Sequence, residues 1–402
     1  MSDTVYLVII FTAIMLGIKF TKQLPIAVCC GILATIILYR INALEVLKIS
    51  AYAVIDKVTI YTVFAFYGIT FLQRMLERRQ DLKRAQKGLD GIFNNRRINV
   101  SLAPALIGTL PSAGAVTICG AIVKEATNGY LNKEEQAFVA SYYRHIPESF
   151  LPTYQSIIIG IELSGVPMSG FLMGMIPMVM VLFTLGYVFY LRKVPSDTGV
   201  TQNISKWQAA KEVFCGLWSL FLTVALIMMF NLPAFAAVLV SIVLNIFVSR
   251  FSWQEISPMF CSAFEGKLII STIIIMVFKD ILASTGAIVR MPELLSRLPI
   301  PAFLIFILIF FFGSVISGQQ AINVIALPLA FSTIPGGGIP LLILLMCTGY
   351  AAMQISPTHV CLAIVTEYFG INMGQIVKKT IPVILSFILC LIGYYLLLGL
   401  FI

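Results

Sequence analysis

The stretch RHIPES, residues 144 to 149, places three ionisable side chains around a proline within a run of apolar residues. Arg144 can bind a carboxylate through two parallel hydrogen bonds, and His145 can exchange a proton near neutral pH. Glu148 can hold a cation or a proton, although it can also form an ion pair with Arg144 along one helical turn. Because ionisable residues inside a membrane are costly and usually functional, this stretch predicts a binding or coupling site.

A second stretch of this kind, QISPTH at residues 354 to 359, contains His359, and the chain has only two histidines. We expect at least one of the two rings to carry a proton or to contact substrate. The alternative is that each ring only satisfies loosened backbone groups. His145 and Glu148 also have the HxxE spacing of metal sites in helical bundles. No HExxH motif and no further set of histidines and carboxylates accompanies them, so we expect no metal.

Polar and glycine residues accompany these ionisable groups wherever an apolar segment is interrupted. Their hydroxyl and amide groups suit hydrogen bonding to a hydroxylated acid, whereas the alternative is that they cap the ends of half-helices. The expected substrate contacts, beside Arg144, His145 and His359, are Ser112, Thr117, Gln319, Gln320, Asn323 and Thr358. The expected contacts to a coupling ion, beside Glu148, are Ser149, Thr109, Gly114, Gly318 and Ser356.

The elements that must position these residues are membrane-spanning helices. Hydrophobic residues make up 59% of the 402-residue chain and charged residues 11%, and apolar runs of about 20 residues, the length that crosses a bilayer, recur throughout. The net charge of +9 is therefore interpreted as a mark of cytoplasmic loops and not of nucleic-acid binding. The eight cysteines lack CxxC spacing and are expected to be free thiols. The first apolar run lacks signal-peptide features and is expected to be a retained helix.

The interruptions divide the chain into two halves of the same plan. We expect an all-α polytopic membrane protein of two inverted repeats, each with five transmembrane helices and one re-entrant hairpin, and with broken helices at mid-membrane. The units are a first repeat at 1–192 (hairpin about 99–127, broken helix about 133–164), a cytoplasmic linker at 193–207, and a second repeat at 208–402 (hairpin about 301–334, broken helix about 339–369). The other crossings are expected near 5–20, 24–40, 58–76, 167–192, 208–230, 231–250, 266–285 and 377–401.

An offset of 210 residues relates the two halves. It joins Glu45 to Glu255, Lys57 to Lys267, Gly108 to Gly318 and Pro147 to Pro357. The hairpin interruptions, the helix breaks and the final spans of the first half also correspond to those of the second half at this offset. Such a correspondence is typical of the internal symmetry of transporters. An odd number of crossings turns the second repeat upside down. The basic arm at 74–97 is expected in the cytoplasm, which places both termini on the extracytoplasmic side.

The four interruptions are expected to meet near the middle of the bilayer. Non-helical backbone survives in hydrocarbon only where protein or water satisfies its N–H and C=O groups. The two hairpin tips, at 109–117 and 317–323, and the two broken-helix centres would bring half-helix N-termini beside free carbonyl groups. Such an arrangement binds an anion at the N-termini and a coupling cation at the carbonyls.

The stretches PALIGTLPSAGAV, SYYRHIPESFLPTY and ISPTHVCLAIVTEYFG resemble the corresponding stretches of a prokaryotic all-transmembrane family of uncharacterised function in the ion-transporter superfamily. That superfamily also contains gluconate permeases and divalent-anion/sodium symporters, and the resemblance extends over nearly the whole chain. It implies a homodimer in the cytoplasmic (inner) membrane of a prokaryote, with a scaffold part and a mobile part that moves like an elevator. It also implies organic-anion substrates driven by sodium or protons, with no other cofactor.

These observations predict a secondary active transporter of a small organic anion, a carboxylate or a sugar acid, and not an enzyme. Arg144 would fix the anion, the hairpin tips would enclose it, and sodium at backbone carbonyls or a proton on a histidine would supply coupling. A cation/proton antiporter on the same fold, with Glu148 as the carrier, is the alternative. A membrane-embedded enzyme is more remote, because the sequence shows no set of nucleophile, base and metal. The expected partners are the anion, the bilayer and a second copy of the chain.

Overall fold

The computed structural model describes residues 3–21, 23–109, 115–197, 205–287, 299–357 and 359–399, and these residues form helices and connections without a strand. The first half contains α1 (Asp3–Thr21), α2 (Leu24–Tyr39), α3 (Ala43–Ile55), α4 (Lys57–Arg79), α5 (Asp81–Phe93), α6 (Arg96–Ile107), α7 (Ala115–Thr127), α8 (Lys133–His145), α9 (Gln155–Ser164) and α10 (Met168–Phe189). The second half contains α11 (Lys206–Phe230), α12 (Ala234–Val248), α13 (Trp253–Ser262), α14 (Gly266–Ser284), α16 (Ala302–Ser317), α17 (Gln319–Thr333), α18 (Gly338–Met353), α19 (Val360–Phe369) and α20 (Met373–Gly399). Two short 3₁₀ helices, η1 (Ile146–Ser149) and η2 (Leu191–Lys193), follow α8 and α10.

Among the described residues, three helices are individually long and apolar enough to cross a bilayer, namely α10, α11 and α20. The pair α3 and α4 forms a fourth such element with a bend of 49° between its helices. Other apolar helices have 10 to 17 residues, which is short of the roughly 20 that a crossing needs. These helices are those of a membrane protein in which many apolar residues lie in helices shorter than a full crossing.

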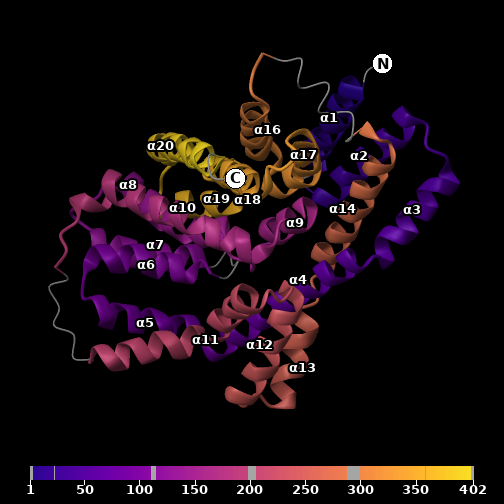
Figure 1. Cartoon of the computed structure of the whole chain (residues 1–402). Helices are drawn as coiled ribbons and strands as arrows, with labels where there is room; N and C mark the ends of the chain where they lie inside the picture. The colour runs from indigo at the N-terminus through magenta and orange to yellow at the C-terminus, as the bar shows by residue number, and fades with distance from the viewer. Residues whose placement is uncertain are drawn as a thin grey trace.

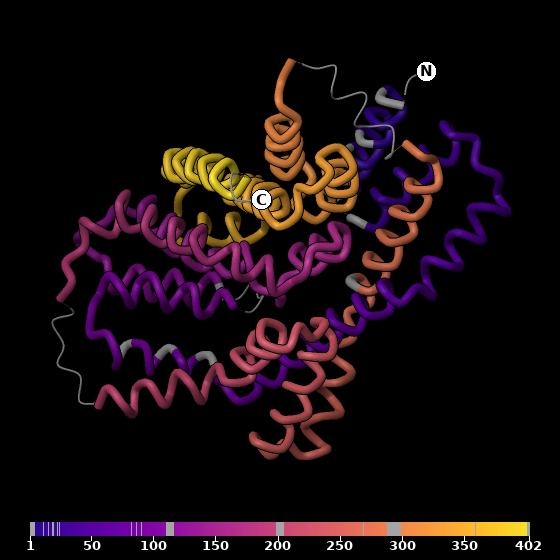
Figure 2. Tube along the Cα trace, in the orientation of Figure 1, coloured from indigo at the N-terminus to yellow at the C-terminus, as the bar shows by residue number. Residues whose placement is uncertain are grey.

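The helices next to the breaks lie in the middle of the molecule (Figure 1). α8 and α9 run across the centre in magenta, with α18 to α20 above them and α4, α11 and α12 below them in this view. The Cα trace in Figure 2 follows the same path and shows α5 running alongside α11 at the lower left. α19 packs on α7 and α8, and α17 packs on α9, so elements of the two halves are interleaved at the centre.

The first predicted helix break is present but lies later in the chain than expected. α8 continues to His145, and residues 146–149 form one 3₁₀ turn, so most of RHIPES is helical. The helical geometry ends at Phe150 and resumes at Gln155. Pro147 does not interrupt this turn because it occupies one of the first two positions, where the missing N–H would have no helical partner.

The other interruptions agree with the prediction to different degrees. The second break matches, since α18 ends at Met353 and α19 begins at Val360. The second hairpin is interrupted at Gly318 alone, with φ 86°, and not over residues 317–323. A glycine accepts this left-handed region without a Cβ clash, so one residue is enough to separate α16 from α17. The expected tip of the first hairpin, residues 111–114, lies outside the described part of the chain.

Helix starts follow the predicted offset of 210 residues only in the early part of each half. α2 and α12 start 210 residues apart (24 and 234), as do α3 and α13 (43 and 253). The separation falls to 205 residues for α8 and α18, α9 and α19, and α10 and α20. The sequence prediction had omitted α3 and α13, because their 13 and 10 residues with charged positions give no apolar run. All eight cysteines are free, as expected, although Cys261 and Cys390 are exposed.

A polar contact joins the end of α4 to α13. Glu255 accepts hydrogen bonds from Nη1 and Nη2 of Arg79 at 3.0 and 3.2 Å, and from the N–H of Ser252 at 3.1 Å. The Ser252 N–H lowers the pKa of Glu255 from its ordinary value; desolvation opposes this, and the hydrogen bonds and charge of Arg79 add to the lowering. The carboxylate therefore stabilises the contact only while it is ionised.

Replacing Glu255 by Gln is expected to lower the apparent melting temperature of the detergent-solubilised protein at pH 7. A carboxylate with a lowered native pKa contributes stability above its unfolded pKa, about 4.3 for Glu, and loses it as pH falls through the native pKa. The difference between Glu255→Gln and the wild type should therefore shrink to nothing in a melting series taken down through that pH range. Glu45→Gln, at the exposed counterpart on α3, is the control and should change little. Equal losses from both variants, or a difference independent of pH, would contradict the assignment.

Candidate functional site

Two helix ends position the ionisable residues that the sequence singled out. α8 starts with a capping box, in which Asn132 accepts from the N–H of Glu135 and Glu135 accepts from the N–H of Asn132. The helix then places Arg144 and His145 in its last turn, where the negative end of the helix dipole favours a cation. His359 immediately precedes α19, and Cys361 lies in the first turn of that helix.

These ends meet, so that residues far apart in the sequence become neighbours. We call Arg144, His145, His359 and Cys361 the central cluster. The rings of His145 and His359, 214 positions apart, have centroids 4.6 Å apart and an interplanar angle of 69°. Arg144, His145 and His359 have exposed fractions of 2%, 0% and 8%. A guanidinium and two imidazoles are therefore held together away from bulk solvent.

The hydrogen bonds of the cluster fix the protons on both rings. Arg144 Nη1 lies 3.1 Å from His145 Nε2, and a guanidinium can only donate, so Nε2 accepts. His145 Nδ1 then carries the hydrogen and donates to the carbonyl of Ser141 at 2.6 Å. His359 Nδ1 donates in the same way to the carbonyl of Met353 at 3.0 Å. Arg144 Nη1 also approaches the sulfur of Cys361 at 3.6 Å.

A cavity of about 320 Å³ opens beside the cluster. Its polar lining includes Arg144, Glu148, Gln320, His359 and Cys361. These residues come from α8, η1, α17 and α19, so both halves of the chain contribute to one chamber. Other lining residues, from α4, the segment after η1, the start of α9 and the N-cap of α14, are Phe66, Ile69, Thr70, Gln73, Thr153, Tyr154, Gln155 and Glu265.

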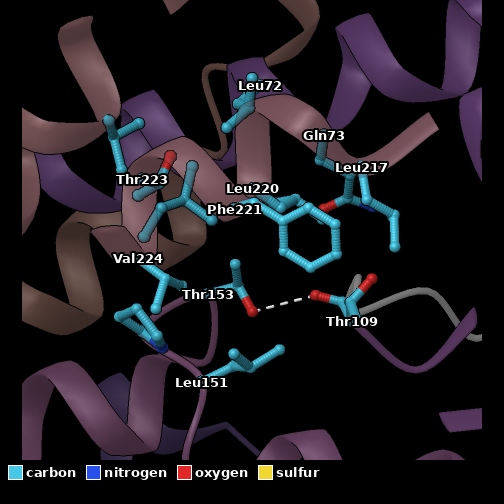
Figure 3. Close-up of a pocket in the computed structure, with 13 residues that line it drawn as sticks. Leu72, Gln73, Thr109, Leu151, Thr153, Leu217, Leu220, Phe221, Thr223 and Val224 are labelled. Carbon is cyan, nitrogen blue, oxygen red and sulfur yellow. Dashed lines mark hydrogen bonds between the residues drawn. The ribbon is translucent and has the colours of Figure 1, made fainter. Parts of the chain in front are cut away.

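A smaller cavity of about 80 Å³ shares part of this wall but differs in chemistry. Figure 3 shows apolar side chains of α4 and α11, such as Leu72, Leu217 and Phe221, pointing into it. The Thr153 hydroxyl donates to the carbonyl of Thr109 at 3.0 Å along its edge. An apolar space of this size does not suit a charged ligand, and we therefore assign ligand binding to the larger cavity.

Several predicted site residues cap local backbone and do not line the cavity. The hydroxyls of Ser149 and Thr109 donate to carbonyls three residues earlier, at 2.7 and 2.8 Å, and Ser356 donates to Val315 at 2.7 Å. The bonds of Ser149 and Thr109 are local caps, whereas that of Ser356 joins segments 41 positions apart. Gln319 donates to the carbonyl of Met346 and Asn323 to that of Ser156, both at 3.0 Å, so these amides join the second hairpin to the helices next to the breaks.

The remaining predicted residues are spread around the site. Thr117 is exposed on the first turn of α7, and Gly318 forms the turn between α16 and α17. Ser112, Gly114 and Thr358 lie outside the described residues. Of the predicted set, the structure gathers Arg144, His145, Glu148, Gln320 and His359 at one place.

Cys361 is a residue of the site that was not predicted from the sequence, where it is one of eight cysteines expected to be free thiols. Its sulfur lies on the cavity wall between Arg144 and His359. The signal that could have found it is the spacing His359-x-Cys361 directly after a proline break. The pairing also supplies a thiol beside an imidazole, a combination that the sequence analysis had regarded as absent.

Gly108 holds the first hairpin against the cluster. A Cβ at Gly108 would collide with the backbone carbonyl of Arg144, and the Tyr154 hydroxyl donates a hydrogen bond to the carbonyl of Gly108. Glycine is therefore required by close approach and not by its backbone angles, since its φ of −69° is open to any residue. The end of α6, the last turn of α8 and the segment after η1 form one packed unit.

The apolar helices and the buried polar chamber that they surround define a helical membrane protein. The chain belongs to the family described as "Protein of unknown function (DUF401)", whose model matches residues 3–397. Its fold is similar to a solved structure described as "Crystal structure of the Alcanivorax borkumensis YdaH transporter reveals an unusual topology", with a TM-score of 0.58 and 12% identity over 90% of this chain and 89% of that one. No curated protein matches the sequence.

Replacing Gly108 by Ala is expected to destabilise the protein by about 1–3 kcal/mol, because the added methyl group meets backbone that cannot rotate away. The measurement is the unfolding of the detergent-solubilised variant, followed by intrinsic fluorescence. Gly393→Ala is the control, since a Cβ at this position in α20 meets no atom within 4 Å. Equal stability of the Gly108 and Gly393 variants would show that the hairpin can move away from α8.

Proposed function

We propose that the protein is a secondary active transporter of a small organic anion, and that Arg144 is the residue that binds the anion. The observation that carries this proposal is the placement of a buried guanidinium on the wall of a polar cavity between broken helices of both halves. The guanidinium offers paired donors that suit a carboxylate in the cavity, and ionisable residues inside a membrane are usually functional. The transporter described for the similar fold supports the class of function.

The size and lining of the cavity support a small, hydroxylated acid. A volume of about 320 Å³ is at the lower end of the roughly 300–1,000 Å³ of ligand pockets. Arg144 offers paired donors for a carboxylate, and Gln320, Thr70 and Gln155 offer amide and hydroxyl groups on other walls. A mono- or dicarboxylate or a sugar acid of this size is the proposed substrate class.

A coupling ion is proposed at the loosened backbone next to the cavity. Asn323 donates through its amide nitrogen, and its Oδ1 atom is buried without a hydrogen-bond partner among the described residues. A buried, unpaired oxygen is costly and suits a hard cation such as sodium. Asn323 is thereby proposed as an ion ligand, and not as the substrate contact that the sequence suggested. Sodium coupling and proton coupling are distinguished by the experiment below.

The proposed movement follows from the two halves. We propose that residues 1–192 and 208–402 are inverted repeats, that the hairpins and broken helices form the mobile part, and that two copies of the chain assemble in the cytoplasmic membrane. The repeated order of helices supports the repeat. The interleaving of α17 with α9 and of α19 with α7 and α8 supports a single mobile unit made from both halves.

The wild-type protein in detergent is expected to gain thermal stability from one class of organic anion, because a ligand that binds only the folded state stabilises it by mass action, by about 2.7 kcal/mol at 100 times the Kd. The panel contains sugar acids, mono-, di- and tricarboxylates and inorganic anions, in sodium and in choline, at pH 6 and pH 8. A shift that needs sodium indicates sodium symport, and a shift that needs low pH indicates proton symport. If sodium or pH changes the stability and no anion does, the result would favour the antiporter. In that case Glu148 on the cavity wall would be the carboxylate that carries the cation or proton.

Arg144→Ala is expected to weaken the binding of that anion by about 100-fold or more, as loss of a buried charged partner does. The control is Arg78→Ala, the same change at an arginine whose side chain is 62% exposed. Arg78→Ala should bind as the wild type does. Arg144→Ala should still unfold cooperatively on heating. A cooperative transition would show that the variant is folded and that its loss of anion binding is not caused by unfolding. Unchanged anion affinity in a folded Arg144→Ala protein would overturn the assignment of this residue.

A further inference from the structure

We propose that His145, His359 and Cys361 form a binding site for one divalent transition-metal ion of the zinc class. One ligand atom from each residue lies within 4.8 Å of the other two. The two histidines are buried and the cysteine is partly buried. The site goes beyond anion transport and does not depend on it, because its three ligands are defined by their own geometry.

The orientation of the histidines is that of metal ligands. A histidine that binds a metal almost always donates its second ring N–H to a carbonyl or a carboxylate, which fixes the ring and the tautomer. His145 makes this bond to the carbonyl of Ser141 at 2.6 Å, and His359 to that of Met353 at 3.0 Å. Each ring therefore presents Nε2, with its lone pair, as the atom that can bind a metal. Two rings from opposite halves of the chain share this arrangement.

The identity of the donor atoms selects the metal. Two imidazole nitrogens and one thiolate suit zinc and its neighbours and are poor ligands for sodium, magnesium or calcium. Tetrahedral zinc, with bonds of about 2.0–2.1 Å to nitrogen and 2.3 Å to sulfur, needs ligand atoms roughly 3.3 to 3.6 Å apart. The longest of the observed separations, at up to 4.8 Å, has to contract by up to about 1.5 Å, a distance that side-chain rotation supplies.

The cavity supplies both the route to the site and its fourth position. His359 and Cys361 line the chamber of about 320 Å³, so an ion can reach them without the helices separating. Glu148 Oε2 lies 4.0 Å from His145 Nε2 and can complete the coordination, as can water. A site with three protein ligands and a fourth position open to a chamber is typical of zinc that remains accessible to small molecules.

Arg144 opposes metal binding in the observed arrangement. Its Nη1 atom lies 3.1 Å from His145 Nε2 and 3.6 Å from the Cys361 sulfur, so the guanidinium occupies the lone pairs that a metal needs. Two positive charges at this distance repel each other strongly where the dielectric constant is low. The metal and the guanidinium therefore compete, and a metal can bind only when Arg144 turns away from the ligands. Replacing Arg144 is therefore expected to strengthen metal binding, an effect that a cluster with a purely structural role would not show.

The test is a titration of the full-length, chelator-treated protein in detergent with Co²⁺, followed by its absorption spectrum and by displacement with Zn²⁺. We expect one equivalent of Co²⁺ to bind, with a thiolate-to-cobalt charge-transfer band, and Zn²⁺ to abolish the band. Cys361→Ser should remove the band. Cys347→Ser, at a buried thiol on α18 that contacts Met175, should keep it.

Further variants distinguish ligands from neighbours. His145→Asn and His359→Asn keep an N–H near the Nδ1 position and remove Nε2. Each should weaken Co²⁺ binding by more than the roughly 10- to 100-fold that loss of a supporting hydrogen bond causes. Arg144→Gln should tighten binding by about tenfold or more, because it removes the competing charge. Because Arg144→Gln is expected to bind Co²⁺ more tightly than the wild type, the proposal can still be tested if one of the ligand variants does not fold.

Three results would overturn the metal site. They are the absence of stoichiometric Co²⁺ binding to the folded wild type, a charge-transfer band that survives Cys361→Ser, and weaker binding in Arg144→Gln. All measurements are made without an organic anion. A failure of the metal proposal therefore leaves the transport proposal untouched, and the reverse also holds.

Discussion

The rule that every backbone N–H and C=O group must find a partner in hydrocarbon governs the rest of this structure. The helix breaks release such groups at the centre of the molecule, and side chains from other segments satisfy them. Tyr154 donates to the carbonyl of Gly108, Thr153 to that of Thr109, and Ser356 to that of Val315. Asn323 and Gln319 donate to carbonyls within α9 and α18, those of Ser156 and Met346, and so tie α17 to these helices. The polar residues at the interruptions thus hold the broken helices together before any ligand is considered.

Hydrogen bonds to backbone carbonyls also orient the ionisable groups at the centre. With the carbonyls of Ser141 and Met353 occupied by the histidine Nδ1 atoms, the Nε2 atoms face the cluster. Arg144 then directs its guanidinium at those lone pairs and at the cavity. The centre therefore combines the positive charge of Arg144 with nitrogen and sulfur lone pairs. In the two proposals made above, the first would bind an anion and the second a soft cation, and the orientation of the Arg144 side chain would select between them.

Much of the fold followed from the sequence because its signals are local. The apolar runs predicted the long helices, and the second break fell at the predicted residues, between α18 and α19. The predictions were wrong where the local sequence is compatible with two backbone conformations of similar energy. Pro147 sits at the start of a 3₁₀ turn and does not end the helix, and Gly318 alone separates α16 from α17. Ser149, Thr109 and Ser356 were predicted from sequence as contacts to a coupling ion, and in the structure their hydroxyls donate to the carbonyls of Ile146, Leu106 and Val315.

By itself, the sequence determined that the chain is a helical membrane protein, the approximate bounds of its long apolar helices, and the position of the break between α18 and α19. These properties depend on hydrophobicity and on backbone sterics, which neighbouring residues set. The tertiary structure decided which breaks meet. It placed His145 against His359 across 214 positions, brought Cys361 to the same wall, and pressed Gly108 against the backbone of Arg144. The pattern of residues along the chain indicates where a helix ends. Which other segment packs against that end depends on contacts between residues far apart in the sequence, and no local pattern predicts such contacts.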